Sequence, residues 1–221
     1  MESYEMDKFL DYIRPEDDEL LACMRKYAKD HYVPIIKNEM KQFLETLVLI
    51  HKPKRILEIG TAIGYSSISM TNIMEKYADL SECEIVSIER SDDMYEQAVI
   101  NIAKANREDL ICVHHDEAEA VLNKLVSDGQ QFDMIFMDAA KGQYLTFLPN
   151  CMTLLKVEGL LVSDNVLQGG DVAKSRFSVP RRQRTIHQRM REYLWELNHR
   201  DDLQTSILDI ADGATISVKL K

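Results

Sequence analysis

The chain has 221 residues, of which 45% are hydrophobic and 29% are charged. This composition is typical of one globular domain whose core is large enough to need no disulfide bond or structural metal. The sequence has no apolar run of about 18 residues, which argues against a transmembrane helix. It starts with an acidic segment rather than a basic one, so we expect no secretory signal. The four cysteines are widely separated, and we expect reduced thiols in a cytoplasmic protein with no membrane partner.

Charge is unevenly distributed along the sequence. The formal net charge is −10, which by itself argues against a nucleic-acid ligand. Seven of the 27 basic residues, however, lie between Lys174 and Arg191 with no acidic residue among them, which leaves 20 basic against 37 acidic residues elsewhere. A basic run is usually a solvated surface, but this asymmetry also fits a site for a polyanion.

The predicted elements change character near residue 50. Before it, apolar residues recur at helical spacing, and Pro34 separates two predicted helices. After it, short apolar runs alternate with helical stretches, which is typical of βαβ units in a parallel sheet covered on both faces. Strands are predicted at 55–59, 84–89, 110–113, 132–137, 159–163, 205–210 and 214–220, and helices at 65–76, 94–105, 118–126 and 183–198.

The order of these elements predicts a Rossmann-like α/β fold. We expect a seven-stranded, mostly parallel sheet with helices on both faces, ending in an antiparallel strand pair joined by a hairpin-type turn. The whole chain, 1–221, is interpreted as one domain. Residues 1–50 form a helical extension, and 51–221 form the core with a basic insertion at 174–191.

A glycine-containing turn follows the first predicted strand. Gly60 and Gly64 are spaced G-x-x-x-G, which permits a tight turn but differs from the pyrophosphate-binding patterns G-x-G-x-x-G and G-x-x-x-x-G-K-[ST]. Open α/β sheets bind ligands at this end of their strands. Glu89 ends the second predicted strand, where an acid can bind the ribose hydroxyls of a nucleoside. The alternative interpretation is a structural turn beside a solvated acid.

Oxygen-bearing side chains follow the next two strands of the predicted sheet. Asp138 comes after strand 132–137, and Asp164 and Asn165 come after strand 159–163. Two carboxylates and an amide suit Mg²⁺, Mn²⁺ or Ca²⁺, and the lack of His or Cys argues against zinc. Lys141 is placed to point into the same crevice. In the alternative interpretation, Asp138 caps the next helix and pairs with Lys141, and Asp164-Asn165 is an ordinary turn.

In combination, these motifs resemble the cation-dependent, S-adenosylmethionine-dependent O-methyltransferases, which include the catechol and caffeoyl-CoA enzymes. The similarity runs from about residue 33 to the C-terminus. Within that family the chain is most similar to the bacterial enzymes that methylate 5-hydroxyuridine at the tRNA wobble position to 5-methoxyuridine. The segments that carry this similarity are 31–35, 59–66, 138–144, 164–167, Asp212-Gly213 and the arginine-rich stretch.

The resemblance implies a class I methyltransferase fold and a role for each matching residue. The pocket for S-adenosylmethionine would be lined by Ile36, Glu58, Gly60, Thr61, Ser66, Glu89, Asp116, Glu117 and Asp138. Asp138, Asp164 and Asn165 would hold the cation, and Mg²⁺ is the ion that we expect ahead of Mn²⁺ or Ca²⁺. Lys141 and Asp138 would be the catalytic residues. The tRNA anticodon arm would contact Lys174, Arg176, Arg181, Arg182, Arg184 and Arg189. The family and the apolar N-terminal helices together suggest a homodimer. Residues 114–117 depart from the glycine-containing turn that the family has after its third strand.

Three other functions remain open on the sequence alone. The first is the same chemistry on a small catechol or a hydroxycinnamoyl-CoA-type substrate; the basic run favours tRNA, although a CoA ester is also anionic. The second is a nucleotide-dependent oxidoreductase, which the glycine spacing and the Asp138, Asp164 and Asn165 set disfavour. The third is a non-catalytic RNA-binding module, which the retention of those three residues and of Lys141 disfavours.

Overall fold

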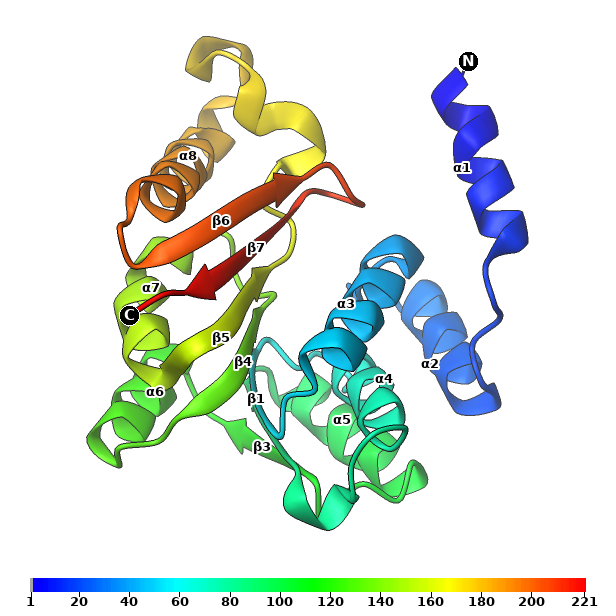
Figure 1. The fold of residues 1–221 in the computed structure, drawn as a ribbon. Helices are drawn as coiled ribbons and strands as arrows, with labels where there is room; N and C mark the ends of the chain where they lie inside the picture. The colour runs from blue at the N-terminus through cyan, green and yellow to red at the C-terminus, as the bar shows by residue number, and fades with distance from the viewer. Residues whose placement is uncertain (1) are drawn as a thin grey trace.

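One seven-stranded sheet forms the centre of the molecule (Figure 1). The computed structural model describes residues 2–221. The strands are β1 (Arg55–Ile59), β2 (Glu84–Glu89), β3 (Ile111–His115), β4 (Phe132–Met137), β5 (Leu155–Ser163), β6 (Leu203–Leu208) and β7 (Ala214–Lys219). Their order is β3-β2-β1-β4-β5-β7-β6; the pairs among β1–β5 are parallel, and β7 runs antiparallel to both of its neighbours. The predicted fold class is confirmed.

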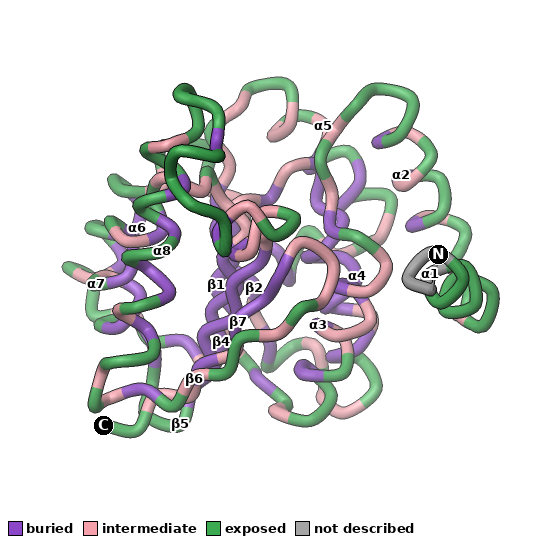
Figure 2. The backbone as a smooth tube through the Cα atoms, turned by 90° about the horizontal axis from the view of Figure 1, so that it is seen from above, coloured by how far each residue is buried: buried purple, intermediate pink, exposed green. Residues whose placement is uncertain are grey.

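Helices cover both faces of this sheet. They are α1 (Glu2–Ile13), α2 (Glu19–Asp30), α3 (Asn38–His51), α4 (Tyr65–Met74), α5 (Asp92–Lys104), α6 (Ala118–Ser127), α7 (Tyr144–Leu154) and α8 (Arg184–His199). Helices α2–α5 share one hydrophobic cluster with the sheet, and α6–α8 share the other. Consecutive residues of β1 show the reason: Ile56 joins the first cluster and Leu57 the second, because side chains alternate across a strand. Figure 2 shows the buried strands between the two helical layers.

The sequence pattern did not predict helix α7. Six of its eleven residues are buried, and Pro149 lies inside it. A helix that is apolar on several sides gives no clear helical period, and an internal proline argues against a helix. The strand that follows, β5, also begins at Leu155, four residues before the predicted start at residue 159. Phe132 pairs with Leu155 and Met134 with Leu160, so β5 has three more residues than β4 between these two pairs, and the register shifts there as at a β-bulge.

The segment between β5 and α8 is built from short turns. These are the 3₁₀ turns η2 (Gln168–Ala173), η3 (Arg176–Ser178) and η4 (Arg181–Gln183), with a further one, η1 (Leu80–Glu82), before β2. Most of the predicted basic insertion therefore lies on an irregular surface segment that leads into α8.

At the other end of the chain, α1 stands apart from the sheet in Figure 1. Among residues 2–221, no helix has the length and apolar character that crossing a membrane would require.

The strand order determines where a ligand can bind. From β1 the chain builds outward to β2 and β3 on one side and to β4 and β5 on the other. The helices that follow β1 and β4, α4 and α7, lie on opposite faces of the sheet. In open α/β sheets, ligands bind at the carboxyl ends of the strands at such a point. The glycine turn and Asp138 lie at this point.

Candidate active site

Gly60 brings the loops after β1 and β4 into contact. Its φ is +108°, a conformation that residues with a side chain rarely adopt. A Cβ at this position would lie 2.0 Å from the carbonyl oxygen of Asp138. The backbone N–H groups of Gly60 and Thr61 both donate to the carbonyl of Ile88 in β2, at 3.1 Å. The turn is thus held between β2 and the segment that carries Asp138.

We expect Gly60→Ala to destabilise the protein by about 3 kcal/mol or more, because backbone strain and a steric clash act together. Gly129→Ala is the matched control. Gly129 also has a positive φ, of +66°, but a Cβ there would meet nothing within 4 Å, so only the strain of about 1 kcal/mol remains. Urea unfolding of both variants measures the difference. Equal losses of stability would show that the contact with Asp138 is unimportant.

Glu58 lies directly beneath the turn and is fully buried, with 0% of its surface exposed. Its carboxylate accepts hydrogen bonds from the hydroxyls of Ser66, Ser67 and Ser87, and Ser87 also contacts the hydroxyl of Thr61. Burial raises the pKa of Glu58 to about 7, and the three serine hydrogen bonds oppose that rise. The structure therefore places three predicted cofactor residues, Glu58, Thr61 and Ser66, in one network that supports the turn.

This buried acid predicts a pH dependence of stability. In the unfolded chain the pKa of Glu58 is near 4.5, so the carboxyl is protonated in both states below that pH and carries no penalty. Between pH 4.5 and about 7 the folded protein keeps a proton that the unfolded chain releases, so this contribution to stability is lost as the pH rises. The loss is on the order of 3 kcal/mol. Urea unfolding between pH 5 and 8 should show a flatter profile for Glu58→Gln; parallel profiles would contradict the assignment.

The structure also assembles the predicted ribose side of the pocket. One oxygen of Glu89 accepts from the N–H groups of Arg90 and Ser91, and the other accepts from Ala62 in the turn, at 2.8 Å. The carbonyl of Glu89 accepts from the N–H of Asp116. Glu89 is thus fixed against the turn, with its remaining acceptor capacity available to a ligand.

The other predicted cofactor residues differ in their surroundings. Asp116 and Glu117 are exposed after β3, and Glu117 forms an ion pair with Arg90 at 3.6 Å. Ile36 is buried in the cluster of helices α2–α5, and its carbonyl lies 3.5 Å from an amino group of Arg25. Asp116 and Glu117 therefore lie on the exposed surface after β3, next to Glu89, whereas the side chain of Ile36 is part of the hydrophobic core.

The three predicted cation ligands lie together at the ends of β4 and β5. Asn165 Nδ2 donates to Asp138 Oδ1 at 2.9 Å, and the N–H of Asp164 donates to the carbonyl of Met137 at the end of β4. Burial raises the pKa of Asp138, and burial together with the Asp138 charge raises the pKa of Asp164 to about 7. Asn165 has φ +60°, a conformation that asparagine tolerates well.

These residues fit a hard divalent cation. Two buried carboxylates that repel each other are stabilised by a positive ion between them, and their oxygens are the ligands that such ions prefer. Within residues 2–221, no group of three or more His, Cys, Asp or Glu side chains is arranged to hold a metal. The third ligand would therefore be the amide of Asn165, whose oxygen and nitrogen exchange places by a half-turn.

Lys141 lies in the loop between β4 and α7 and is partly buried. Its positive charge lowers the pKa values of Asp138 and Asp164, against the larger effect of burial. The N-cap residue of α7 is Gln143, so Asp138 does not cap this helix as the alternative interpretation required. No hydrogen bond or ion pair of the Lys141 side chain is recorded in the described chain. Lys141 is thus close enough to the two carboxylates to affect their pKa values, and its amino group remains free to contact a ligand.

The structure divides the predicted RNA-binding residues into two groups. Arg184 donates to the carbonyl of Val179, Arg189 donates to that of Gly142, and Lys174 pairs with Asp171 at 2.7 Å. Arg176, Arg181 and Arg182 are exposed and have no recorded side-chain partner within residues 2–221. The first group holds the segment together, and the second leaves three positive charges open to a ligand.

Sequence analysis missed Ser67 and Ser87, which bind Glu58. A signal was present, because Glu58 and Ser87 are the polar residues inside two otherwise apolar runs and are paired in the β1–β2 register. Sequence analysis named Asp212 only as part of a matching segment and gave it no role at the site; its charge raises the pKa of Asp164, and its carboxylate pairs with Lys37 at 3.0 Å. That contact joins residues 175 positions apart and leaves no pattern in the sequence.

The fold is that of the class I methyltransferases. The structure matches the O-methyltransferase TomG from Streptomyces achromogenes, which is involved in tomaymycin synthesis and was solved with SAM, with a TM-score of 0.84 and 25% identity over 98% of this chain and 96% of that one. It also matches an O-methyltransferase from Bacillus cereus in complex with SAH, with a TM-score of 0.83 and 23% identity over 97% of each chain.

The model of a protein family described as O-methyltransferase matches residues 12–220. The caffeoyl-CoA O-methyltransferase of Populus kitakamiensis is 30% identical over 202 residues, which are 90% of this chain and 83% of that protein. The catechol O-methyltransferase of Niastella koreensis is 31% identical over 172 residues, which are 77% and 76% of the two chains. The chain belongs to this O-methyltransferase family.

Proposed function

We propose that the protein transfers a methyl group from S-adenosylmethionine to the 5-hydroxyl of 5-hydroxyuridine at the wobble position of tRNA, with the help of a divalent cation. Three features support the cofactors: the family, the glycine turn with Glu89, and the cluster of Asp138, Asp164 and Asn165. The observation that carries the RNA substrate is the segment directly after the cation ligands. It presents the exposed side chains of Arg176, Arg181 and Arg182, which have no partner among residues 2–221.

An exposed aromatic side chain accompanies these arginines. Phe177 is 84% exposed, and the Arg184 guanidinium lies 5.9 Å from the centre of its ring. Basic residues interleaved with exposed aromatic side chains are typical of surfaces that bind single-stranded nucleic acid, since phosphates meet the charges and bases stack on the rings. A loop of tRNA presents unstacked bases of this kind.

These groups account for the proposed reaction. S-adenosylmethionine, held at the glycine turn and Glu89, would supply the methyl group. The substrate oxygen would form the new C–O bond as the C–S bond breaks, and the electron pair would remain on sulfur. A cation held by Asp138, Asp164 and Asn165 would supply positive charge that lowers the pKa of the substrate hydroxyl. Lys141 Nζ, in its neutral form, would accept the hydroxyl proton. Gly60 holds the cofactor turn against Asp138, so the two halves of the site keep a fixed relative orientation.

A small substrate is the second candidate function. It is favoured by the relatives, which are named as catechol and caffeoyl-CoA enzymes. Catechol and 5-hydroxyuridine share a hydroxyl group beside a second oxygen on the neighbouring ring carbon, a pair suited to the same kind of cation site. The chemistry of the site therefore fits both, and the basic segment favours the RNA.

Nucleoside mass spectrometry of tRNA from a strain that lacks the gene tests the proposal. We expect 5-methoxyuridine to disappear and 5-hydroxyuridine to accumulate, and the purified protein with S-adenosylmethionine and Mg²⁺ should restore the methylated nucleoside. An unchanged nucleoside profile, together with turnover of catechol or caffeoyl-CoA, would refute the tRNA assignment in favour of the second candidate.

We also propose that the protein is a homodimer. Helix α1 exposes Met6, Phe9, Tyr12 and Ile13, and large apolar surfaces of this kind are typical of protein contacts. Sedimentation velocity measures the mass; a monomer at micromolar concentration would contradict the proposal.

A further inference from the structure

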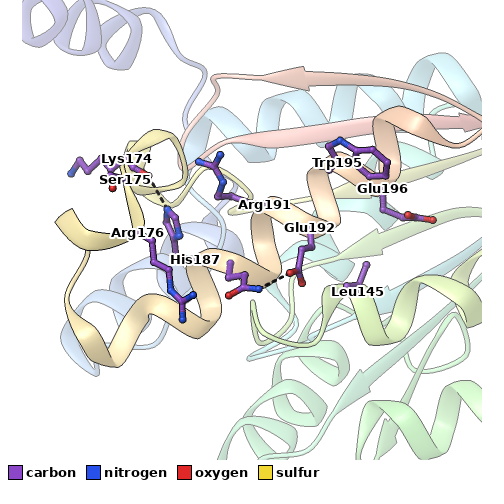
Figure 3. Close-up of a pocket in the computed structure, with 10 residues that line it drawn as sticks. Leu145, Lys174, Ser175, Arg176, His187, Arg191, Glu192, Trp195 and Glu196 are labelled. Carbon is purple, nitrogen blue, oxygen red and sulfur yellow. Dashed lines mark hydrogen bonds between the residues drawn. The ribbon is translucent and has the colours of Figure 1, made fainter.

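A groove with a volume of about 780 Å³ lies along α8, outside the cation site (Figure 3). Its lining residues are Leu145, Lys174, Ser175, Arg176, His187, Gln188, Arg191, Glu192, Trp195 and Glu196. A volume of this size suits a ligand as large as a nucleotide. Lys174 and Arg176 belong to the basic segment already assigned to RNA, whereas the other lining side chains have no role in the proposed reaction.

The groove is connected to the candidate active site. Leu145 lies in the first turn of α7, four residues after Lys141. Arg189 of α8 donates to the carbonyl of Gly142, at 2.9 Å, in the loop that carries Lys141. A ligand that extends from the cation site over this loop would therefore reach the groove.

Positive charge is available at one end of the groove. Arg176 has no recorded side-chain partner within residues 2–221, and Arg191 uses one amino group to bind the carbonyl of Val172. Glu196 pairs with Arg200, whereas Glu192 accepts from the uncharged amide of Gln188 and keeps its negative charge. Arg176 and Arg191 each have guanidinium N–H groups left to donate to a phosphate.

An aromatic platform lies farther along α8. Trp195 is 61% exposed and stacks on His199, with ring centres 4.0 Å apart and an angle of 10° between the planes. This stacking orients the indole ring while leaving most of the side chain open to solvent. Stacking on such a ring stabilises an unpaired base and is tolerant of its identity.

A buried histidine supplies the second, independent observation. His187 lines the groove and is only 2% exposed. Its Nε2 lies 3.1 Å from the carbonyl of Lys174 and must donate, since a carbonyl only accepts. In the neutral ring Nδ1 is then an acceptor, and no hydrogen-bond partner is recorded for it in the described chain. A buried acceptor without a donor needs one from outside the chain, either an ordered water or a hydroxyl or amino group of a ligand.

We propose that this groove binds a nucleotide that neighbours the methylated uridine in the RNA substrate. Its base stacks on Trp195, and its phosphate lies at Arg176 and Arg191. The inference rests on the proposed function, because it requires an RNA chain whose modified base occupies the cation site. It adds that the enzyme holds its substrate on both sides of the loop that carries Lys141.

Fluorescence provides a direct test, because Trp195 is the only tryptophan in the chain. Titration of the full-length protein with an anticodon stem-loop RNA that contains 5-hydroxyuridine should quench the emission to saturation. A CoA ester also contains a nucleotide and is the alternative ligand for the groove. Separate titrations with adenosine 3′,5′-bisphosphate and with coenzyme A test for it. Quenching by the RNA and not by these two compounds supports the proposal.

Variants test the role of the same residues in turnover. We expect Trp195→Ala to raise the KM for the stem-loop about tenfold, with a smaller effect on kcat and none on the Kd for S-adenosylmethionine. Trp195→Phe should restore most of the affinity. Arg176→Ala should also raise this KM, whereas Lys124→Ala, an exposed charge on α6, serves as the matched control and should not.

Two results would overturn the proposal, and they are distinguishable. If the wild-type protein methylates the stem-loop while Trp195 emission and the KM of Trp195→Ala do not change, the groove is not an RNA site and the proposed function stands. If the wild-type protein methylates no RNA and coenzyme A quenches the emission instead, the proposed function and this inference both fail.

Discussion

Asp138→Asn and Asp164→Asn should each lower methyl transfer at least about 100-fold while the protein stays folded. The two carboxylates end neighbouring strands, and Asn165 donates to Asp138 at 2.9 Å, so all three side chains can reach one ion. Each substitution removes one negative charge at nearly constant volume. Since burial and the neighbouring carboxylate raise the pKa of Asp164, the loss of either charge should relieve repulsion and leave the fold intact.

The measurement compares initial rates with Mg²⁺ in excess and after treatment with a chelator. Mg²⁺ should also raise the Tm of the wild-type protein, because a ligand that binds the folded state stabilises it, and it should raise the Tm of both variants less. Asp128→Asn, at the exposed end of α6, is the control and should behave like the wild type. Near-normal turnover by either variant in chelator-treated buffer would eliminate the cation mechanism.

Charge reversal at Arg181 and Arg182 should weaken tRNA binding by at least about tenfold and flatten its dependence on salt. Both side chains are exposed and unpartnered in the described chain, so their replacement disturbs no recorded contact. Each basic side chain that binds a phosphate releases a counterion from the RNA. When such a contact is lost, that counterion is no longer released, and the slope of log Kd against log salt concentration falls by about one. We therefore expect Arg181→Glu with Arg182→Glu to lower this slope by about two.

A double variant elsewhere on the surface gives the matched comparison. Lys104→Glu with Lys124→Glu changes the net charge by the same amount on exposed positions of α5 and α6. Its tRNA affinity should fall much less, since neither lysine belongs to the basic segment 174–191. If both double variants bind tRNA equally well, the binding reflects net charge, and the assignment of residues 174–191 to RNA is wrong.

Several features of the molecule follow from local patterns. The alternation of strands and helices after residue 50 predicts the α/β class, because parallel strands buried on both faces need helical connections. The positions of Asp138, Asp164 and Asn165 at strand ends predict their proximity, since the carboxyl ends of parallel strands meet at one edge. Helix α7 escaped prediction because Pro149 and its apolar content hide the helical period.

Other properties depend on contacts between distant segments. The sequence places Glu58 in a strand, but only the packing of α4 and β2 around it makes it a buried acid with three serine donors. The basic run is visible in the sequence, but the sequence does not show which of its charges are engaged. In the structure Arg189 donates to the carbonyl of Gly142, whereas Arg181 and Arg182 have no side-chain partner among residues 2–221. The sequence alone determined the class of fold and the chemical types at the site, because backbone periodicity and residue type are local. The structure decided which charges are paired, buried or open, because those properties depend on neighbours brought together by folding.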